Sequence, residues 1–144
     1  MEPVVDHIQI TVRDLDRAVA FYDRFLPLLG FDVSCKGSAA IEAHDFRVVE
    51  YVHPRLAIAL SSPRQAFAAE PVHRRRPGAL HHLAFRASSR DEVDRLHREL
   101  MAIGATIVSA PRVHPEYVPA RYYAMFFKDP DGIKYEIVHH AGVP

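Results

Sequence analysis

The sequence predicts an α+β protein built from two βαβββ modules, and two observations support this. Residues 6–33 (DHIQITVRDLDRAVAFYDRFLPLLGFDV) and residues 81–108 (HHLAFRASSRDEVDRLHRELMAIGATIV) present the same signals in the same order. Each has a histidine, an alternating strand, a charged turn, an amphipathic helix that ends at glycine, and a second strand; each half then continues into further strand-like runs. One such unit cannot bury its apolar face alone, so we expect the 144 residues to form one domain from two packed modules.

The first module is predicted over residues 1–60. Val4–Val12 alternates as a strand, and apolar residues from Leu15 to Leu29 recur at helical spacing until Gly30 ends the helix. Three further strands are expected at Phe31–Lys36, Phe46–Val52 and Leu56–Leu60, with turns at Gly37-Ser38 and His53-Pro54-Arg55. Cys35 is then expected as a buried or half-buried strand residue.

Residues 61–79 are predicted to form a linker, because prolines interrupt them and neither period is present. Within it, Arg74-Arg75-Arg76 is interpreted as a solvated stretch, with anion binding as the alternative.

The second module is predicted over residues 80–144. Ser89 and Glu92 form a capping box at the start of its helix. Its strands are expected at Leu80–Arg86, Thr106–Ser109, Tyr122–Phe127 and Ile133–His139, with a long loop over residues 110–121 and a tight turn at residues 129–132.

Composition excludes several classes of function. Hydrophobic residues make up 49% and charged residues 25%, as in ordinary globular proteins. Lys plus Arg and Asp plus Glu both number 18, which gives no electrostatic reason to expect nucleic acid as a partner. No apolar run approaches the ~20 residues of a membrane span. The single cysteine, Cys35, rules out an internal disulfide and fits a cytoplasmic location.

Two histidines and one glutamate are the candidate metal ligands. His7 and His82 both open the pattern His-apolar-x-apolar at the start of their modules, and Glu136 lies in an otherwise apolar strand. A charge buried there without a partner costs several kcal/mol, and binding a divalent metal together with the histidines removes that cost. His81 and His82 are expected to point to opposite faces, and the repeat selects His82. Exposed histidines and a solvated glutamate are the alternative interpretation.

With these residues the chain resembles the vicinal oxygen chelate superfamily, which includes glyoxalase I, fosfomycin-resistance transferases, bleomycin-resistance proteins and extradiol dioxygenases. The resemblance rests on the paired modules, on DHIQITV and HHLAF at their starts, and on FKDPDGIKYEIV near the end. It implies a cup-shaped, partly open mixed β-sheet barrel with flanking helices. It also implies one divalent metal ion held by His7, His82 and Glu136, with zinc, nickel, iron and manganese equally compatible.

Departures from the family patterns limit which residues can supply a further metal ligand or a catalytic acid or base. Glyoxalase I takes a second carboxylate from the last strand of the first module, where this chain has only apolar residues, 57–60; Glu50 in the preceding strand is the alternative source. Extradiol dioxygenases use an additional histidine or tyrosine as acid or base. His114, Tyr117, Tyr122 and Tyr123 are candidates for that role, and the resemblance favours Tyr122 as the tyrosine that points inward.

The resemblance therefore implies a divalent-metal-dependent lyase, isomerase or dioxygenase. Its small-molecule substrate chelates the metal through vicinal oxygens, and Glu136, Tyr122 and His114 are the expected catalytic residues. A metal-free binding protein of the bleomycin-resistance type is the alternative. Because related proteins often share the site between chains, we expect a homodimer that combines His7 of one chain with His82 and Glu136 of the other.

Overall fold

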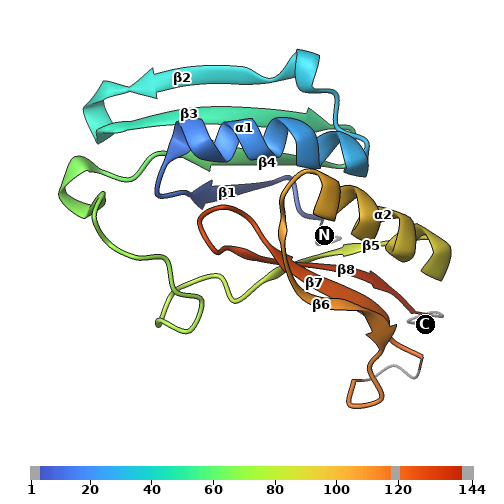
Figure 1. The fold of residues 1–144 in the computed structure, drawn as a ribbon. Coiled ribbons are helices and arrows are strands. Elements are labelled where there is room, and N and C mark those ends of the chain that lie inside the picture. The colour runs from blue at the N-terminus through green and yellow to red at the C-terminus, as the bar shows by residue number, and fades with distance from the viewer. Residues whose placement is uncertain (1–3, 118–120, 141–144) are drawn as a thin grey trace. The chain divides into compact units, whose positions relative to one another are not determined.

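The chain folds as two compact units, residues 1–72 and 73–144, whose boundary lies within the predicted linker. A computed structural model describes residues 4–117 and 121–140. Residues 118–120 of the predicted loop and 141–144 of the predicted second module lie outside this range. In the described residues each unit contributes one four-stranded mixed sheet with an α-helix along one face (Figure 1). The predicted α+β class and the two modules are confirmed, and each sheet is open rather than closed into a barrel.

The first unit has the strand order β1-β4-β3-β2, in which β1 and β4 are parallel and the other neighbours antiparallel. Its elements are β1 (His7–Thr11), α1 (Leu15–Phe25), β2 (Gly37–Ile41), β3 (Phe46–His53) and β4 (Leu56–Ser61). Asp14 begins α1 by accepting a hydrogen bond from the Arg17 amide at 3.0 Å. The apolar side of α1 is buried together with Ile58 and Leu60 of β4.

The prediction of a strand at Phe31–Lys36 is wrong. Val33–Cys35 form a short 3₁₀ helix, and the strand begins at Gly37, which was expected to lie in a turn. The physical reason is Asp32, whose carboxylate accepts hydrogen bonds from both the amide and the hydroxyl of Ser34, at 2.9 and 2.7 Å. This local turn competes successfully with an extended backbone. Cys35 is consequently exposed rather than buried.

The second unit repeats the topology with the order β5-β8-β7-β6 and a parallel β5–β8 pair. Its elements are β5 (Leu83–Arg86), α2 (Arg90–Ala102), β6 (Thr106–Val113), β7 (Tyr123–Lys128) and β8 (Lys134–His139). No helix in the described part of the chain is both long enough and apolar enough to cross a bilayer. The long loop expected from residue 110 begins later, because β6 continues to Val113 with register shifts at Ile107/Ser109 and Ser109/Arg112.

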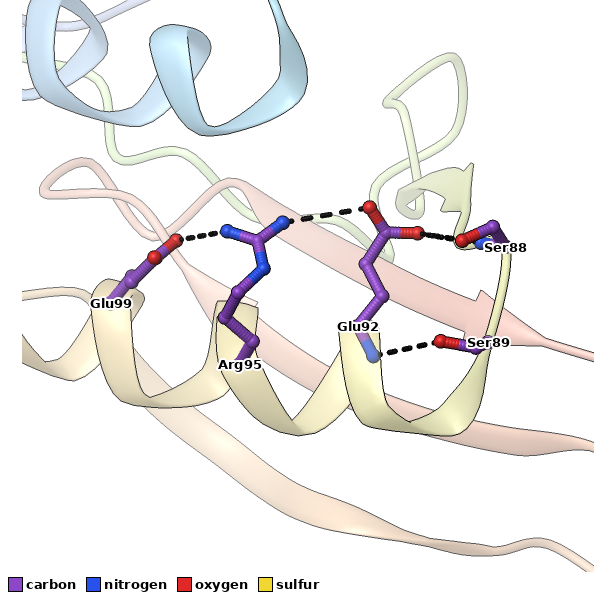
Figure 2. Close-up of polar contacts among 5 residues, drawn as sticks. All are labelled: Ser88, Ser89, Glu92, Arg95 and Glu99. Carbon is purple, nitrogen blue, oxygen red and sulfur yellow. Dashed lines mark hydrogen bonds and ion pairs between the residues drawn. The ribbon is translucent and has the colours of Figure 1, made fainter.

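The predicted start of α2 is confirmed in a modified form (Figure 2). The Ser89 hydroxyl accepts a hydrogen bond from the Glu92 amide at 3.1 Å. The Glu92 carboxylate accepts from the amide and hydroxyl of Ser88, both at 2.7 Å, rather than closing back onto Ser89. Arg95 continues the network by donating to Glu99 at 2.8 Å and to Glu92 at 3.5 Å. The first turn of α2 is therefore held by both backbone caps and charges.

The turn between β7 and β8 sets the position of Glu136. The Asp129 carboxylate accepts hydrogen bonds from the amides of Asp131 and Ile133, both at 2.9 Å, and Gly132 has the positive φ of 87° that favours glycine. The predicted tight turn is confirmed. It pairs Phe126 with Glu136 across the β7–β8 ladder.

We expect Ser89→Ala to lower the free energy of unfolding by about 1 kcal/mol, because it removes the acceptor that caps α2. Chemical denaturation measures this change. Ser109→Ala, on β6, is the matched control and should have a smaller effect. Equal losses in the two variants would contradict the capping role of Ser89.

Candidate functional site

The carboxylate of Glu136 is buried and has two partners within the second unit. Glu136 is 2% exposed. Its Oε2 atom lies 3.1 Å from His82 Nε2, and its Oε1 atom accepts a hydrogen bond from the Tyr122 hydroxyl at 2.6 Å. The structure thus brings together three of the residues predicted for the site: His82, Tyr122 and Glu136.

These side chains occupy the face of the sheet that points away from α2. Phe126 and Ala84 pair with Glu136 on the neighbouring strands and so share its face. Tyr123 points the other way and donates a hydrogen bond to Asp94 of α2 at 2.7 Å. Tyr122, rather than Tyr123, therefore faces the site, as the resemblance implied.

His114 completes an aromatic cluster beside Tyr122. Its ring stacks on Tyr117, with centroids 5.2 Å apart, and meets Tyr122 and Phe126 edge to face at 6.4 and 5.5 Å. His114 is 2% exposed, and its Nε2 atom has no hydrogen-bond partner among the described residues. A buried ring nitrogen without a partner is costly, which marks this atom as a point where a ligand can bond.

Glu116, which the sequence analysis did not identify, fixes the state of His114. Its carboxylate lies 2.9 Å from His114 Nδ1, and this hydrogen bond is the largest of the contacts that lower the pKa of Glu116 to about 2. An ionised carboxylate only accepts, so His114 Nδ1 donates and, in the neutral ring, Nε2 carries the lone pair. The signal in the sequence is the His-Pro-Glu spacing at the end of β6.

The expectation that His81 and His82 point to opposite faces is wrong. Their Nδ1 atoms are 2.7 Å apart and their ring centroids 5.0 Å apart. The reason is that β5 begins at Leu83, so the alternation of a strand does not extend to the two histidines. His82 remains the member of the pair that contacts Glu136.

His7, the third predicted ligand, lies in the first unit. Its Nδ1 atom is 2.7 Å from the Asp6 carboxylate, and its side chain is 57% exposed. Gln9 shares its face of β1 and donates to Ser61 of β4 at 2.5 Å. Ladder pairing also places Ala59 and Glu50 beside Gln9, so Glu50 stands on the same face of the sheet as His7.

The second-unit residues fit a divalent metal. Two ligand atoms each about 2.1 Å from one ion lie roughly 3.0 to 3.4 Å apart, in octahedral and tetrahedral geometry respectively. The separation of 3.1 Å between His82 Nε2 and Glu136 Oε2 falls in that range. Imidazole nitrogen and carboxylate oxygen are also donors that zinc, iron, nickel and manganese accept. Within residues 4–117 and 121–140 no ready group of three His, Cys, Asp or Glu ligands is found.

Comparison with known proteins places the chain in a family. The sequence model of the glyoxalase/bleomycin resistance protein/dioxygenase superfamily matches residues 4–137. This protein belongs to that superfamily. The resemblance to vicinal oxygen chelate proteins is thereby confirmed.

Individual relatives agree with this assignment. The uncharacterised protein YqjT of Bacillus subtilis (strain 168) is 33% identical over 132 residues, which cover 92% of this chain and 95% of YqjT. A protein of known structure from Bacillus halodurans is 31% identical with a TM-score of 0.74, covering 96% of this chain and 97% of its own. A glyoxylase/bleomycin resistance protein/dioxygenase domain from Frankia sp. EAN1pec has the same fold, with 24% identity, a TM-score of 0.78, and coverage of 98% and 100%.

Tyr122 should titrate at unusually high pH. Burial, followed by the hydrogen bond to Glu136, raises the pKa of its phenol above the ordinary 10.0. Glu136→Gln removes the negative charge, so the pKa of Tyr122 should fall toward 10.0 in an ultraviolet titration. Asp94→Asn is the matched control and should lower the pKa of Tyr123 instead. An unchanged Tyr122 titration in Glu136→Gln would show that burial alone raises this pKa.

Proposed function

We propose that this protein is a divalent-metal-dependent enzyme of the lyase, isomerase or dioxygenase type that acts on a small molecule with vicinal oxygens. The observation that carries the proposal is the buried Glu136 carboxylate, shared between His82 and Tyr122 beside the His114 nitrogen that has no hydrogen-bond partner among the described residues. Structural packing alone does not require two polar partners and a free ring nitrogen on one sheet face. Membership of a superfamily that includes metal enzymes supports the same conclusion.

His82 and Glu136, with His7 as the third ligand, would hold the metal. A divalent ion bound there polarises a substrate carbonyl or hydroxyl and stabilises negative charge on its oxygen. Three protein ligands leave positions open for two substrate oxygens.

Tyr122 and His114 supply complementary proton chemistry. The raised pKa of Tyr122 keeps its proton in place at neutral pH, so its hydroxyl can donate to a substrate oxygen. His114 Nε2 is oriented as an acceptor through Glu116 and can receive a proton from the substrate. Phe126, 5% exposed, and the ring of His140, stacked on Tyr122 at 5.7 Å, keep water away from these groups.

The ligand set is tested by metal analysis of protein purified without an affinity tag. Alanine at His7, His82 or Glu136 should each lower bound metal at least tenfold, whereas His97→Ala on α2 should retain the wild-type content. His81→Ala should have a smaller effect than His82→Ala, because His81 contacts His82 but not Glu136. Wild-type metal content in the His82 and Glu136 variants would contradict the proposal.

The same preparation separates an enzyme of this type from a metal-free binding protein. Acetohydroxamate, a small bidentate oxygen chelator, should raise the melting temperature of the metal-loaded protein by the linkage of ligand to the native state, and leave metal-stripped protein unchanged. Equal protection in both forms would favour the binding protein.

We further propose a homodimer in which His7 of one chain joins His82 and Glu136 of the other. The exposed side chain of His7 on the edge strand β1 supports this arrangement.

The exposed free thiol of Cys35 agrees with the reducing cytoplasm as the location.

Mixing His7→Ala with Glu136→Ala protein should restore metal binding by complementation. Random exchange makes about half of the dimers mixed, and each mixed dimer has one intact site, so about a quarter of all sites should recover. Metal content before and after mixing is the measurement. A monomer in analytical ultracentrifugation, or no recovery from exchanging dimers, would exclude the shared site.

A further inference from the structure

Lys134 is a cation on the face of the candidate site. It lies two residues before Glu136 on β8, so both side chains emerge on the same side of the sheet. Its Nζ atom is 4.0 Å from the centroid of the Phe126 ring. The ring attracts an ammonium group but does not neutralise it. The Glu136 oxygens are taken by His82 and Tyr122, and no ion pair of Lys134 is found among the described residues.

Arg74 supplies a second positive charge in the same place. Its Nε atom is buried and has no hydrogen-bond partner in the part of the chain that the structure describes. Its charge acts directly on the ammonium group of Lys134. Two positive charges of the second unit, on Lys134 and Arg74, therefore lie near each other.

We propose that Lys134 and Arg74 bind a carboxylate carried by the small molecule whose vicinal oxygens meet His82 and Glu136. This inference rests on the proposed function for the location of those oxygens. An ammonium and a guanidinium, both partly removed from water, bind an anion through charge-assisted hydrogen bonds, and the guanidinium fork matches a carboxylate. The substrate class is thus an acid with two neighbouring oxygens rather than a neutral carbonyl compound or diol. Arg74-Arg75-Arg76 was interpreted as a solvated stretch, with anion binding as the alternative. The proposed carboxylate site favours anion binding for Arg74.

The preference for an anion is measured with a matched pair of ligands, 3,4-dihydroxybenzoate and 3,4-dihydroxybenzamide. Both have the same vicinal oxygens and nearly the same shape, and only the benzoate has a negative charge at neutral pH. Isothermal titration calorimetry on the metal-loaded and metal-stripped protein gives the ratio of their dissociation constants. We expect wild-type protein to bind the benzoate at least tenfold more tightly than the benzamide.

Variants show which residues determine the ratio of the two dissociation constants. Lys134→Met and Arg74→Met should bring it close to one, and Lys134→Arg should keep it, because the charge is retained. Arg98→Met removes one positive charge from the exposed side of α2 and should leave the ratio unchanged. Circular dichroism confirms the fold of each variant, and Lys134→Gln replaces Lys134→Met if the latter unfolds.

The outcomes separate the two proposals. A ratio near one in wild-type protein, a preference that survives both Lys134→Met and Arg74→Met, or no binding of either ligand at millimolar concentration would overturn the anion site. A benzoate preference together with dissociation constants that are the same with and without metal would support the anion site while contradicting the metal-dependent enzyme.

Discussion

The buried carboxylate of Glu136 is the constraint on which the second unit depends. A carboxylate at 2% exposure is tolerated only when its oxygens are bonded, and isolated burial costs several kcal/mol. Three separate elements meet that need. The Asp129 turn places β8 in register with β7, Tyr122 approaches from the residue before β7, and His82 approaches from the residue before β5. The site is therefore a condition of folding for this unit as well as a place for chemistry.

The two modules share a topology but divide their polar residues differently. In the second unit a small residue, Ala84, stands beside Glu136 on the parallel β5–β8 pair. In the first unit the equivalent pair of positions holds Gln9 and Ala59, so the polar side chain is on the first strand and the small one on the last. The two modules thus share one backbone plan, while only the second has a charged residue at this point. The asymmetry explains why the first unit presents His7 without a carboxylate from β4.

Much of the fold could be predicted from the sequence, because hydrophobic periodicity and capping residues mark the helices, strands and turns. Hydrophobic spacing located both helices, and the Ser89 cap and the Asp129 turn were recognisable from residue type alone. Predictions failed where a single side chain redirected the backbone, as Asp32 does before β2. They also failed where strand alternation was extended beyond a strand, as at His81. Residue patterns identify period and turn chemistry, whereas the competition between a local side-chain bond and a ladder is decided by contacts distant in sequence.

The same limit applies to the candidate site. His82 was identified from its place in the repeat, Glu136 from its place in an apolar strand, and Tyr122 from the family resemblance, although His82 and Tyr122 each come just before a strand. Glu116 was missed, since its partner His114 comes to it through loop geometry rather than strand period. Lys134 was missed because a lysine near a strand end is usually solvated, and only the contact with the Phe126 ring distinguishes it.

The two register shifts in β6 have a consequence for how this protein can change during evolution. Without them, antiparallel pairing counted from Ile107 and Phe127 would set residue 112 opposite Tyr122; with two extra residues His114 takes that place, its amide bonded to the Tyr122 carbonyl at 2.8 Å. Deleting one residue at a shift would remove that shift and leave His114 opposite Tyr122. Deleting one residue from the regular part of β6 while both shifts remain would instead place His114 opposite Tyr123 and, because side chains alternate, turn its imidazole to the other face of the sheet. The effect of a deletion in β6 therefore depends on whether it falls at a register shift or in the regular ladder, and only the second kind separates His114 from Tyr122.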